Sequence, residues 1–385
     1  MGIYLNPENG PFEESVQREI YVDKSLLIEK VWNHAKKKNK FICISRPRRF
    51  GKSTDANMLT AFFSKGCDSA ELFRDLKISG WEDYETHLNR HNVIHLDMQK
   101  FLSETHDIAG MIRRMNKKVI RDLQKVFPDY CEDESLSDVL NEIRAECRVS
   151  FIFVIDEWDC IFREFKNDKE AQKGYLDYLR LLLKEQPYVE LAYMTGILPI
   201  KKYGTHSALN MFDEISMLDA KDFSEYMGFT EQEVEGLCEK YEIDFARMKE
   251  WYDGYHMRNG VSTYSPRSVT AAIGNRDFAN YWSQTETYEA LKAYIDLNYD
   301  GLKNVIIDLL AGRRANIDTL SFQNDMSSFT SKDDVLTLLV HLGYLGYYQD
   351  VGEVYIANNE VKDTFVISVK NSNWNYITKV FKNAV

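Results

Sequence analysis

A short segment with the order strand, basic loop, Gly-Lys-Ser and helix constrains the fold of this chain more than any other feature. Residues 41–45 (Phe-Ile-Cys-Ile-Ser) are mostly apolar and predict a short buried strand. The loop Arg46-Pro-Arg-Arg-Phe-Gly follows, and Lys52-Ser-Thr then begins a helical pattern. This is the layout of a phosphate-binding loop, in which backbone N–H groups and the positive end of a helix dipole face phosphate oxygens.

One residue of this segment departs from the usual pattern, which is G-x-x-x-x-G-K-[ST]. Arg46 stands where the first glycine belongs, and a glycine there permits an unusual backbone angle. Taken alone, the segment fits equally well a basic turn at the start of a helix, with Lys52 and Ser53 solvated.

A second motif favours the phosphate-binding interpretation. Residues 151–155 predict an apolar strand, and Asp156 and Glu157 follow directly. An Asp at this place of a nucleotide-binding fold holds Mg²⁺, and a following Glu can polarise the attacking water. A buried strand that ends at an acidic surface turn is the alternative. Because both motifs occur in the right order, we predict that Lys52 reaches the β- and γ-phosphates and that Ser53 and Asp156 hold Mg²⁺.

From about residue 10 to residue 370 the chain resembles the AAA-ATPase-like family. Its loop Arg46-Pro-Arg-Arg-Phe-Gly-Lys-Ser is close to the family signature, in which a loop without the first glycine is the normal form. Other segments similar to family motifs follow one another along the chain: Tyr21-Val-Asp-Lys, Asp156-Glu-Trp-Asp, Thr195-Gly-Ile-Leu, Phe229-Thr-Glu-Gln-Glu-Val and Trp251-Tyr-Asp-Gly-Tyr. The resemblance implies a P-loop ATPase of the additional-strand class that binds ATP with Mg²⁺.

The resemblance also implies which residues form the site. The loop residues that would contact the nucleotide are Arg48, Arg49, Phe50, Gly51, Lys52, Ser53 and Thr54. Glu157 would activate the water. Thr195 stands just past the fourth predicted strand, where related ATPases carry a polar sensor of the γ-phosphate; a Thr-Gly pair that caps a strand is the alternative. No arginine finger can be assigned, and Arg48 and Arg49 either serve in cis or face a neighbouring subunit.

The predicted fold is an α/β P-loop NTPase with a parallel sheet in the order 5-1-4-3-2 and right-handed crossovers. The predicted strands are 41–45, 93–98, 151–155, 189–194 and 214–218. We expect three regions along the chain: a nucleotide-binding domain (1–220), a helical lid (221–330) and a winged-helix-like segment (331–385). Within them, Thr230 with Glu233 predicts a capping box, and Pro266 predicts the first position of a helix.

Composition limits the other functions. The net charge of −12 argues against a protein that coats nucleic acid in general, although the helix predicted over 108–127 has a basic outer face. The six cysteines form no C-x-x-C pair, which indicates reduced thiols rather than a zinc site. The N-terminus lacks the features of a signal peptide, and no apolar run approaches about 20 residues. We therefore expect a cytoplasmic protein that does not span a membrane.

Members of this family usually continue into a PD-(D/E)XK nuclease-like domain. The tail of this chain has no D-x(n)-E-x-K pattern, so we expect either a member without that domain or a truncated sequence, and assign no nuclease chemistry. Besides ATP hydrolysis, two functions stay open. One is a slow-turnover switch that holds ATP or ADP and acts on a protein partner or on a second copy of itself. The other is a nucleic-acid-associated regulator that uses the basic face of residues 112–121.

Overall fold

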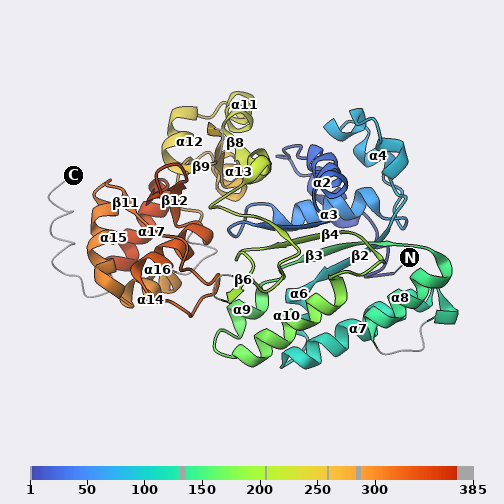
Figure 1. Ribbon diagram of the computed structural model, residues 1–385. Helices are drawn as coiled ribbons and strands as arrows, with labels where there is room; N and C mark the ends of the chain where they lie inside the picture. Colours follow the sequence, from blue (N-terminus) through green and yellow to red (C-terminus); the bar gives the residue numbers. More distant parts are fainter. Residues whose placement is uncertain (1, 131–134, 204–205, 258–259, 283–287, 371–385) are drawn as a thin grey trace. The chain divides into compact units, whose positions relative to one another are not determined.

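The structure of the chain is a computed structural model, which describes residues 2–130, 135–203, 206–257, 260–282 and 288–370 (Figure 1). By their contacts the residues fall into two units. The first comprises Met1–Ser45 and Gly51–Ile215, and the second comprises Arg46–Phe50 and Ser216–Val385. Residues 371–385 of the predicted winged-helix-like segment lie outside the described residues. The boundary predicted at residue 330 stays a prediction.

A five-stranded parallel sheet with the order β2-β3-β4-β1-β7 forms the centre of the first unit. Its strands are β1 (Phe41–Ser45), β2 (Asn92–Asp97), β3 (Phe151–Asp156), β4 (Val189–Gly196) and β7 (Asp213–Ile215). Every residue of β1 and of β3 is buried, as expected for strands that are covered on both faces of a parallel sheet. Read from its other edge, this is the predicted order 5-1-4-3-2, with β7 as the fifth strand, so the predicted fold is confirmed.

Helices cover both faces of this sheet (Figure 1). α2 and α3 lie on one face, and α6, α7 and α10 lie on the other. The helices of the first unit are α1 (Gly10–Val16), α2 (Leu26–Lys37), α3 (Lys52–Phe63), α4 (Ala70–Phe73), α5 (Tyr84–His87), α6 (Met98–Ser103), α7 (Ile108–Gln124), α8 (Leu136–Cys147), α9 (Cys160–Glu164) and α10 (Lys169–Leu183). A two-stranded ribbon, β5 (Lys202–Tyr203) and β6 (His206–Ser207), completes this unit.

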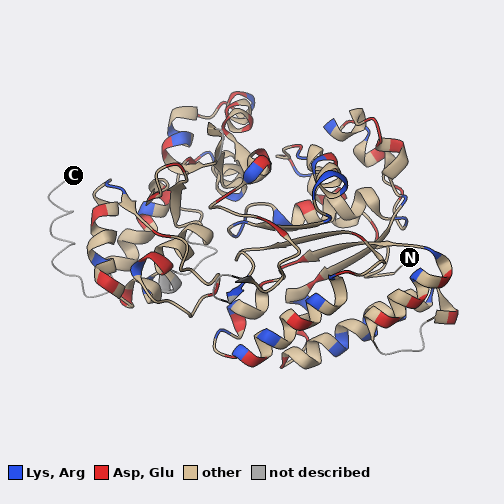
Figure 2. Ribbon diagram, viewed as in Figure 1, with Lys and Arg blue, Asp and Glu red and all other residues tan. Residues whose placement is uncertain are grey.

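The helix α7 has the amphipathic character that its sequence predicts. Asp107 caps its N-terminus by accepting a hydrogen bond of 2.6 Å from the N–H of Gly110. Its apolar side chains at a spacing of four are buried, whereas Arg113, Lys117 and Arg121 are exposed. Basic residues therefore recur along the outer face of α7 (Figure 2), and the predicted basic face is confirmed.

The second unit contains seven α-helices among the described residues and two small antiparallel sheets. The helices are α11 (Glu231–Tyr241), α12 (Phe245–Tyr252), α13 (Pro266–Asn275), α14 (Tyr288–Asp296), α15 (Leu302–Leu310), α16 (Lys332–His341) and α17 (Asn359–Lys370). One sheet has the order β8 (Phe229–Thr230), β10 (Ser262–Tyr264), β9 (Tyr255–His256), and the other has the order β11 (Ala315–Asn316), β13 (Glu353–Ile356), β12 (Leu345–Tyr348).

Local sequence signals determine several helix starts in the second unit. Thr230 and Glu233 form the predicted capping box at the start of α11. Pro266 is the first residue of α13, as predicted, because its fixed φ suits that position. Further along, α16 is followed by a turn at Gly343 and then by the hairpin β12–β13. None of the helices in the described ranges is both long enough and apolar enough to cross a membrane.

Candidate functional site

The carboxyl ends of β1, β3 and β4 meet at one edge of the sheet in the first unit. Asp156, the last residue of β3, pairs in register with Thr195 of β4 and with Asp97 of β2. Ser45, the last residue of β1, pairs with Gly196. In parallel α/β sheets this edge is where ligands bind, because the strand ends and the helix N-termini converge there.

The turn between β1 and α3 uses two left-handed backbone angles. Arg49 has φ 67° and Gly51 has φ 83°, and Gly51 occupies the N-cap position of α3. A side chain is disfavoured at Gly51 because of this angle. As in any α-helix, the N–H groups of the first turn, which begins at Lys52, have no intrahelical acceptor and carry a partial positive charge. They are the groups that a phosphate-binding loop offers to an anion.

Three predicted residues come together at this edge of the sheet. Asp156 is 5% exposed, and burial raises its pKa to about 6, with the charges of Glu157 and Asp97 adding to the rise. A hydrogen bond from Ser53 and the charge of Lys52 act in the opposite direction. The structure thus places a buried lysine, a hydroxyl and a carboxylate within reach of one another.

The oxygen ligands at this place suit a magnesium ion. Ser53 offers a hydroxyl and Asp156 offers a carboxylate, and both are hard oxygen donors of the kind that Mg²⁺ prefers. The described ranges contain no group of three or more His, Cys, Asp or Glu side chains that could hold a metal ion by themselves. Mg²⁺ is commonly bound by one or two protein ligands, with substrate phosphates and water completing its shell. Ser53 and Asp156 therefore fit a Mg²⁺ ion that shares its coordination shell with phosphates.

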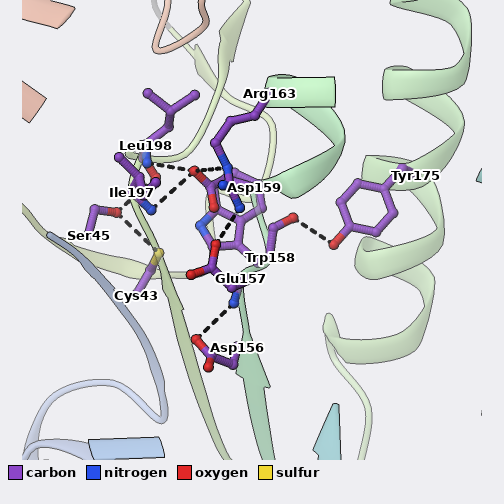
Figure 3. A network of polar contacts seen from close by, with 10 residues as sticks. All are labelled: Cys43, Ser45, Asp156, Glu157, Trp158, Asp159, Arg163, Tyr175, Ile197 and Leu198. Atoms are coloured by element: carbon purple, nitrogen blue, oxygen red, sulfur yellow. Dashed lines mark hydrogen bonds and ion pairs between the residues drawn. The ribbon is translucent and has the colours of Figure 1, made fainter. Parts of the chain in front are cut away.

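Glu157, the residue after β3, lies in an unusual conformation. Its φ is 53°, in the left-handed region that few residues other than glycine adopt. Its N–H donates to Oδ1 of Asp156 over 2.9 Å. Its carboxylate forms an ion pair with the guanidinium of Arg163 in α9 (Figure 3).

Hydrogen bonds join the Asp156-Glu-Trp-Asp segment to the Thr195-Gly-Ile-Leu segment. Oδ2 of Asp159 accepts from the N–H of Ile197 (3.1 Å) and from that of Leu198 (2.8 Å). The N–H of Trp158 donates to the carbonyl of Thr195 over 3.2 Å. The loops that follow β3 and β4 are therefore held together (Figure 3), although the two motifs are far apart in the sequence.

Two further contacts extend this network. The hydroxyl of Ser45 donates to the carbonyl of Leu198 over 2.9 Å, which ties the end of β1 to the loop after β4. On the other side, the hydroxyl of Tyr175 in α10 donates to the carbonyl of Trp158 over 2.8 Å. The turn between β1 and α3 thus begins at Ser45, whose side chain is hydrogen-bonded to the loop after β4.

Thr195 lies within β4 (Val189–Gly196), not past its end as predicted, because the strand extends to Gly196, and it is next to Asp156 in the sheet. It is fully buried, and its hydroxyl donates to the carbonyl of Ile44 over 2.9 Å. In this conformation the hydroxyl of Thr195 forms a hydrogen bond between β4 and β1. A contact with phosphate would require it to exchange this bond.

The loop residues Arg46–Phe50 belong by their contacts to the second unit. Arg46 is 2% exposed, and its Nη1 donates to the carbonyl of Tyr226 over 2.5 Å. Phe50 is also buried and packs edge-on against Tyr255, with 5.3 Å between ring centroids, and against Trp282, at 6.2 Å.

The other predicted loop residues are more accessible. Arg48, Arg49 and Ser53 are exposed, and Thr54 is half-buried. Arg46 is not among the residues with a positive φ, so the conformational freedom of the usual first glycine is not needed in this loop. Its arginine instead supplies a buried hydrogen bond.

Two further residues of the network, Asp159 and Arg163, were not predicted as site residues. The sequence signal for Arg163 was weak: it is a charged residue directly after the apolar pair Ile161-Phe162. Asp159 could be found only as part of a family motif, because its role depends on N–H groups about forty residues away in the sequence.

Comparisons with known proteins give one curated relative, several solved structures and one family model. A curated relative, described as an uncharacterized protein in the vnfD 5' region of Azotobacter chroococcum mcd 1, is 24% identical over 323 residues, which cover 80% of this chain. The chain spans 58% of the length of that relative.

Two solved structures align over most of the chain. The Walker-type ATPase of Pyrococcus abyssi has a TM-score of 0.44 at 15% identity, with 91% of this chain and 97% of that chain covered. Cdc6p from Pyrobaculum aerophilum has a TM-score of 0.32 at 12% identity, with 93% of this chain and 98% of that chain covered.

The family model described as "Predicted AAA-ATPase" matches residues 12–205, which is half of the sequence. This chain belongs to the AAA-ATPase-like family, as its motifs predicted.

Proposed function

We propose that this chain binds ATP together with Mg²⁺ and hydrolyses the terminal phosphate. One observation carries the proposal: Lys52, Ser53 and Asp156, which come from two distant motifs, lie together at the carboxyl edge of a parallel sheet. A lysine, a hydroxyl and a carboxylate in this arrangement are the protein groups that hold a nucleotide triphosphate and its metal in P-loop ATPases.

The first step is binding. The N–H groups of the first turn of α3 face the phosphates, and the Lys52 ammonium neutralises charge on the β- and γ-phosphates. Ser53 and Asp156 would hold Mg²⁺, which when bound would supply positive charge beside the phosphates. Gly51 and Thr54 line the turn, and Arg48, Arg49 and Phe50 complete the loop. Arg48 and Arg49 are exposed, and their guanidinium groups would contact phosphate or a neighbouring subunit.

The second step is hydrolysis. Glu157 accepts a hydrogen bond from the attacking water and orients it toward the γ-phosphorus. Thr195 stands beside Asp156, from where its hydroxyl can report the presence of the γ-phosphate after exchanging its bond to Ile44. Phosphoryl transfer has a loose transition state, so that positioning and electrostatics supply most of the rate enhancement.

A nucleotide switch with slow turnover is the second candidate. The contacts of residues 46–50 favour a switch. These residues follow β1 and lead to Lys52, and by their contacts they belong to the second unit, where the side chains of Arg46 and Phe50 are buried. Nucleotide occupancy would bias the conformation of the predicted helical lid (221–330), which would signal to a protein partner or to a second copy.

Turnover of Mg²⁺-ATP by the purified chain distinguishes the two candidates. We expect measurable hydrolysis that Lys52→Ala and Glu157→Gln each reduce at least about 100-fold, with Glu157→Gln still binding ATP. Lys173→Ala, an exposed lysine in α10, is the matched control and should hydrolyse ATP like the wild type. Binding without turnover would favour the switch. A chain that binds no nucleotide would overturn both candidates.

A further inference from the structure

Arg163 is a buried arginine that faces two carboxylates of the site (Figure 3). Its side chain is 8% exposed. One terminal nitrogen, Nη2, contacts Oε2 of Glu157, and Nε lies 3.5 Å from Oδ2 of Asp159. Arginine is seldom buried unless it is paired. Here the two partners are carboxylates of the same motif, Glu157 and Asp159, so we ask what the arginine does for them.

The negative charge of Asp159 favours the protonated form of Arg163. Burial alone would lower the pKa of Arg163, but the charges of Asp159 and Glu157 outweigh burial and raise it, so that the guanidinium stays protonated. Asp159 is itself rigid, because its Oδ2 accepts the N–H groups of Ile197 and Leu198. A continuous series of contacts therefore runs from the loop after β4 through Asp159 and Arg163 to Glu157.

The ion pair uses only one oxygen of the Glu157 carboxylate. Oε2 contacts Arg163, whereas Oε1 has no hydrogen-bond partner among the described residues. The side chain is 23% exposed, so solvent reaches it. The backbone of Glu157 is fixed as well, by its left-handed φ and by its bond to Asp156. One oxygen is thus anchored while the other is available to a water molecule.

We propose that Arg163 is the positioning residue for Glu157. It holds the carboxylate in one orientation, so that Oε1 is directed at the attacking water and the side chain does not swing into solvent. This inference rests on the proposed ATPase activity and adds the residue that orients its water-activating group. A carboxylate tied to a guanidinium suits orientation of the water, which is what a loose transition state demands of the protein.

Replacement of Arg163 tests this role. Arg163→Met keeps a long apolar stem and removes the charge. We expect kcat to decrease roughly 10- to 100-fold, because a small misplacement of a catalytic group has effects of that size, while KM and the Kd for ATP stay within about twofold. Arg163→Lys restores a charge without the planar fork and should recover part of kcat. Arg90→Met, an exposed arginine elsewhere in the first unit, should match the wild type.

A second measurement separates positioning from a purely structural role. Because Arg163 acts through Glu157, Arg163→Met should change single-turnover hydrolysis by less than about twofold when Glu157→Gln is already present. A structural role would lower the rate in both backgrounds and would weaken ATP binding. If Arg163→Met does not fold, Arg163→Lys carries the test: a several-fold lower kcat at unchanged Kd supports the proposal, and an unchanged kcat overturns it.

The remaining outcomes are also decisive. An Arg163→Met enzyme with wild-type or higher kcat overturns the positioning role and leaves the proposed function intact, provided that hydrolysis still depends on Lys52 and Glu157. An equal loss in the Glu157→Gln background overturns it as well. A wild-type chain without any hydrolysis overturns the ATPase proposal and this inference together.

Discussion

Oδ2 of Asp159 accepts a hydrogen bond of 2.8 Å from the backbone N–H of Leu198, which is 39 residues away in the sequence. The same oxygen accepts from the N–H of Ile197. Asp159 is fully buried, so water cannot take its place as the acceptor of these two N–H groups. One carboxylate oxygen therefore fixes the loop after β4 to the loop after β3, and it does so beside the proposed catalytic glutamate.

Asp159→Ala should destabilise the first unit by about 2–4 kcal/mol. Two buried N–H groups lose their acceptor, and each such loss costs about 1–3 kcal/mol. Arg163 also loses a partner. Urea unfolding that is followed by circular dichroism measures the change, with the exposed Asp75→Ala as a control that should stay within about 0.5 kcal/mol of the wild type. A loss below about 1 kcal/mol would show that these bonds contribute little.

The sequence was sufficient to predict the sheet and the meeting of Lys52, Ser53 and Asp156. Asp156 ends β3, and Lys52 and Ser53 begin the helix that follows β1, and parallel strands bring their carboxyl ends to one edge. Local pattern and topology together therefore determine which of these side chains become neighbours.

The sequence could not predict the roles of Arg163 and Arg46. The contact of Arg163 with Glu157 depends on a left-handed backbone angle at Glu157, which no residue pattern indicates for a glutamate. For Arg46 the sequence showed a missing glycine, but the acceptor of its side chain, the carbonyl of Tyr226, lies 180 residues further along the chain. Both roles depend on tertiary contacts of a single side chain, which periodicity and spacing do not reveal.

Gly196→Ala should destabilise the first unit by about 1–3 kcal/mol, the usual range for overpacking in a core. A Cβ at this position would lie 2.6 Å from Oδ1 of Asp159 and 2.8 Å from Cδ1 of Trp158, which is too close for either group. Gly174→Ala is the matched comparison: it lies exposed in α10, where a Cβ meets nothing within 4 Å.

Gly174→Ala should therefore stabilise the chain by about 0.5–1 kcal/mol. Opposite signs in urea unfolding for the two glycine variants would establish the close contact around Gly196. If both variants changed stability alike, the crowding at Gly196 would be relieved by movement of Trp158.

Phe50→Ala should destabilise the second unit by about 3–5 kcal/mol, as expected for a large aromatic side chain removed from a core. This effect is notable for a residue of the phosphate-binding loop, and it follows from the packing of Phe50 against Tyr255 and Trp282. Arg48→Ala, an exposed position in the same loop, should leave stability within about 0.5 kcal/mol. Equal stability of the two variants in urea unfolding would contradict the assignment of Phe50 to the core of the second unit.

Glu360 should make the stability of the second unit depend on pH. Burial raises the pKa of its carboxyl from 4.5 to about 7, although hydrogen bonds from Ser268, Tyr281 and Trp282 act in the opposite direction. Between pH 4.5 and pH 7 the folded chain keeps this proton while the unfolded chain releases it. Stability is therefore greatest below pH 4.5 with respect to this group and falls as pH rises through 7, by on the order of 3 kcal/mol.

Glu360→Gln should remove this decrease. The amide oxygen can accept the N–H groups of Tyr281 and Trp282, and its NH₂ can donate to Ser268, so the contacts are kept without a buried charge. We expect the variant to be on the order of 1–3 kcal/mol more stable than the wild type at pH 8 and similar to it at pH 5. Urea unfolding from pH 5 to pH 8 measures both chains, and Glu239→Gln, an exposed carboxylate of α11, should keep the wild-type slope. A Glu360→Gln variant with that same slope would mean that another group causes the dependence on pH.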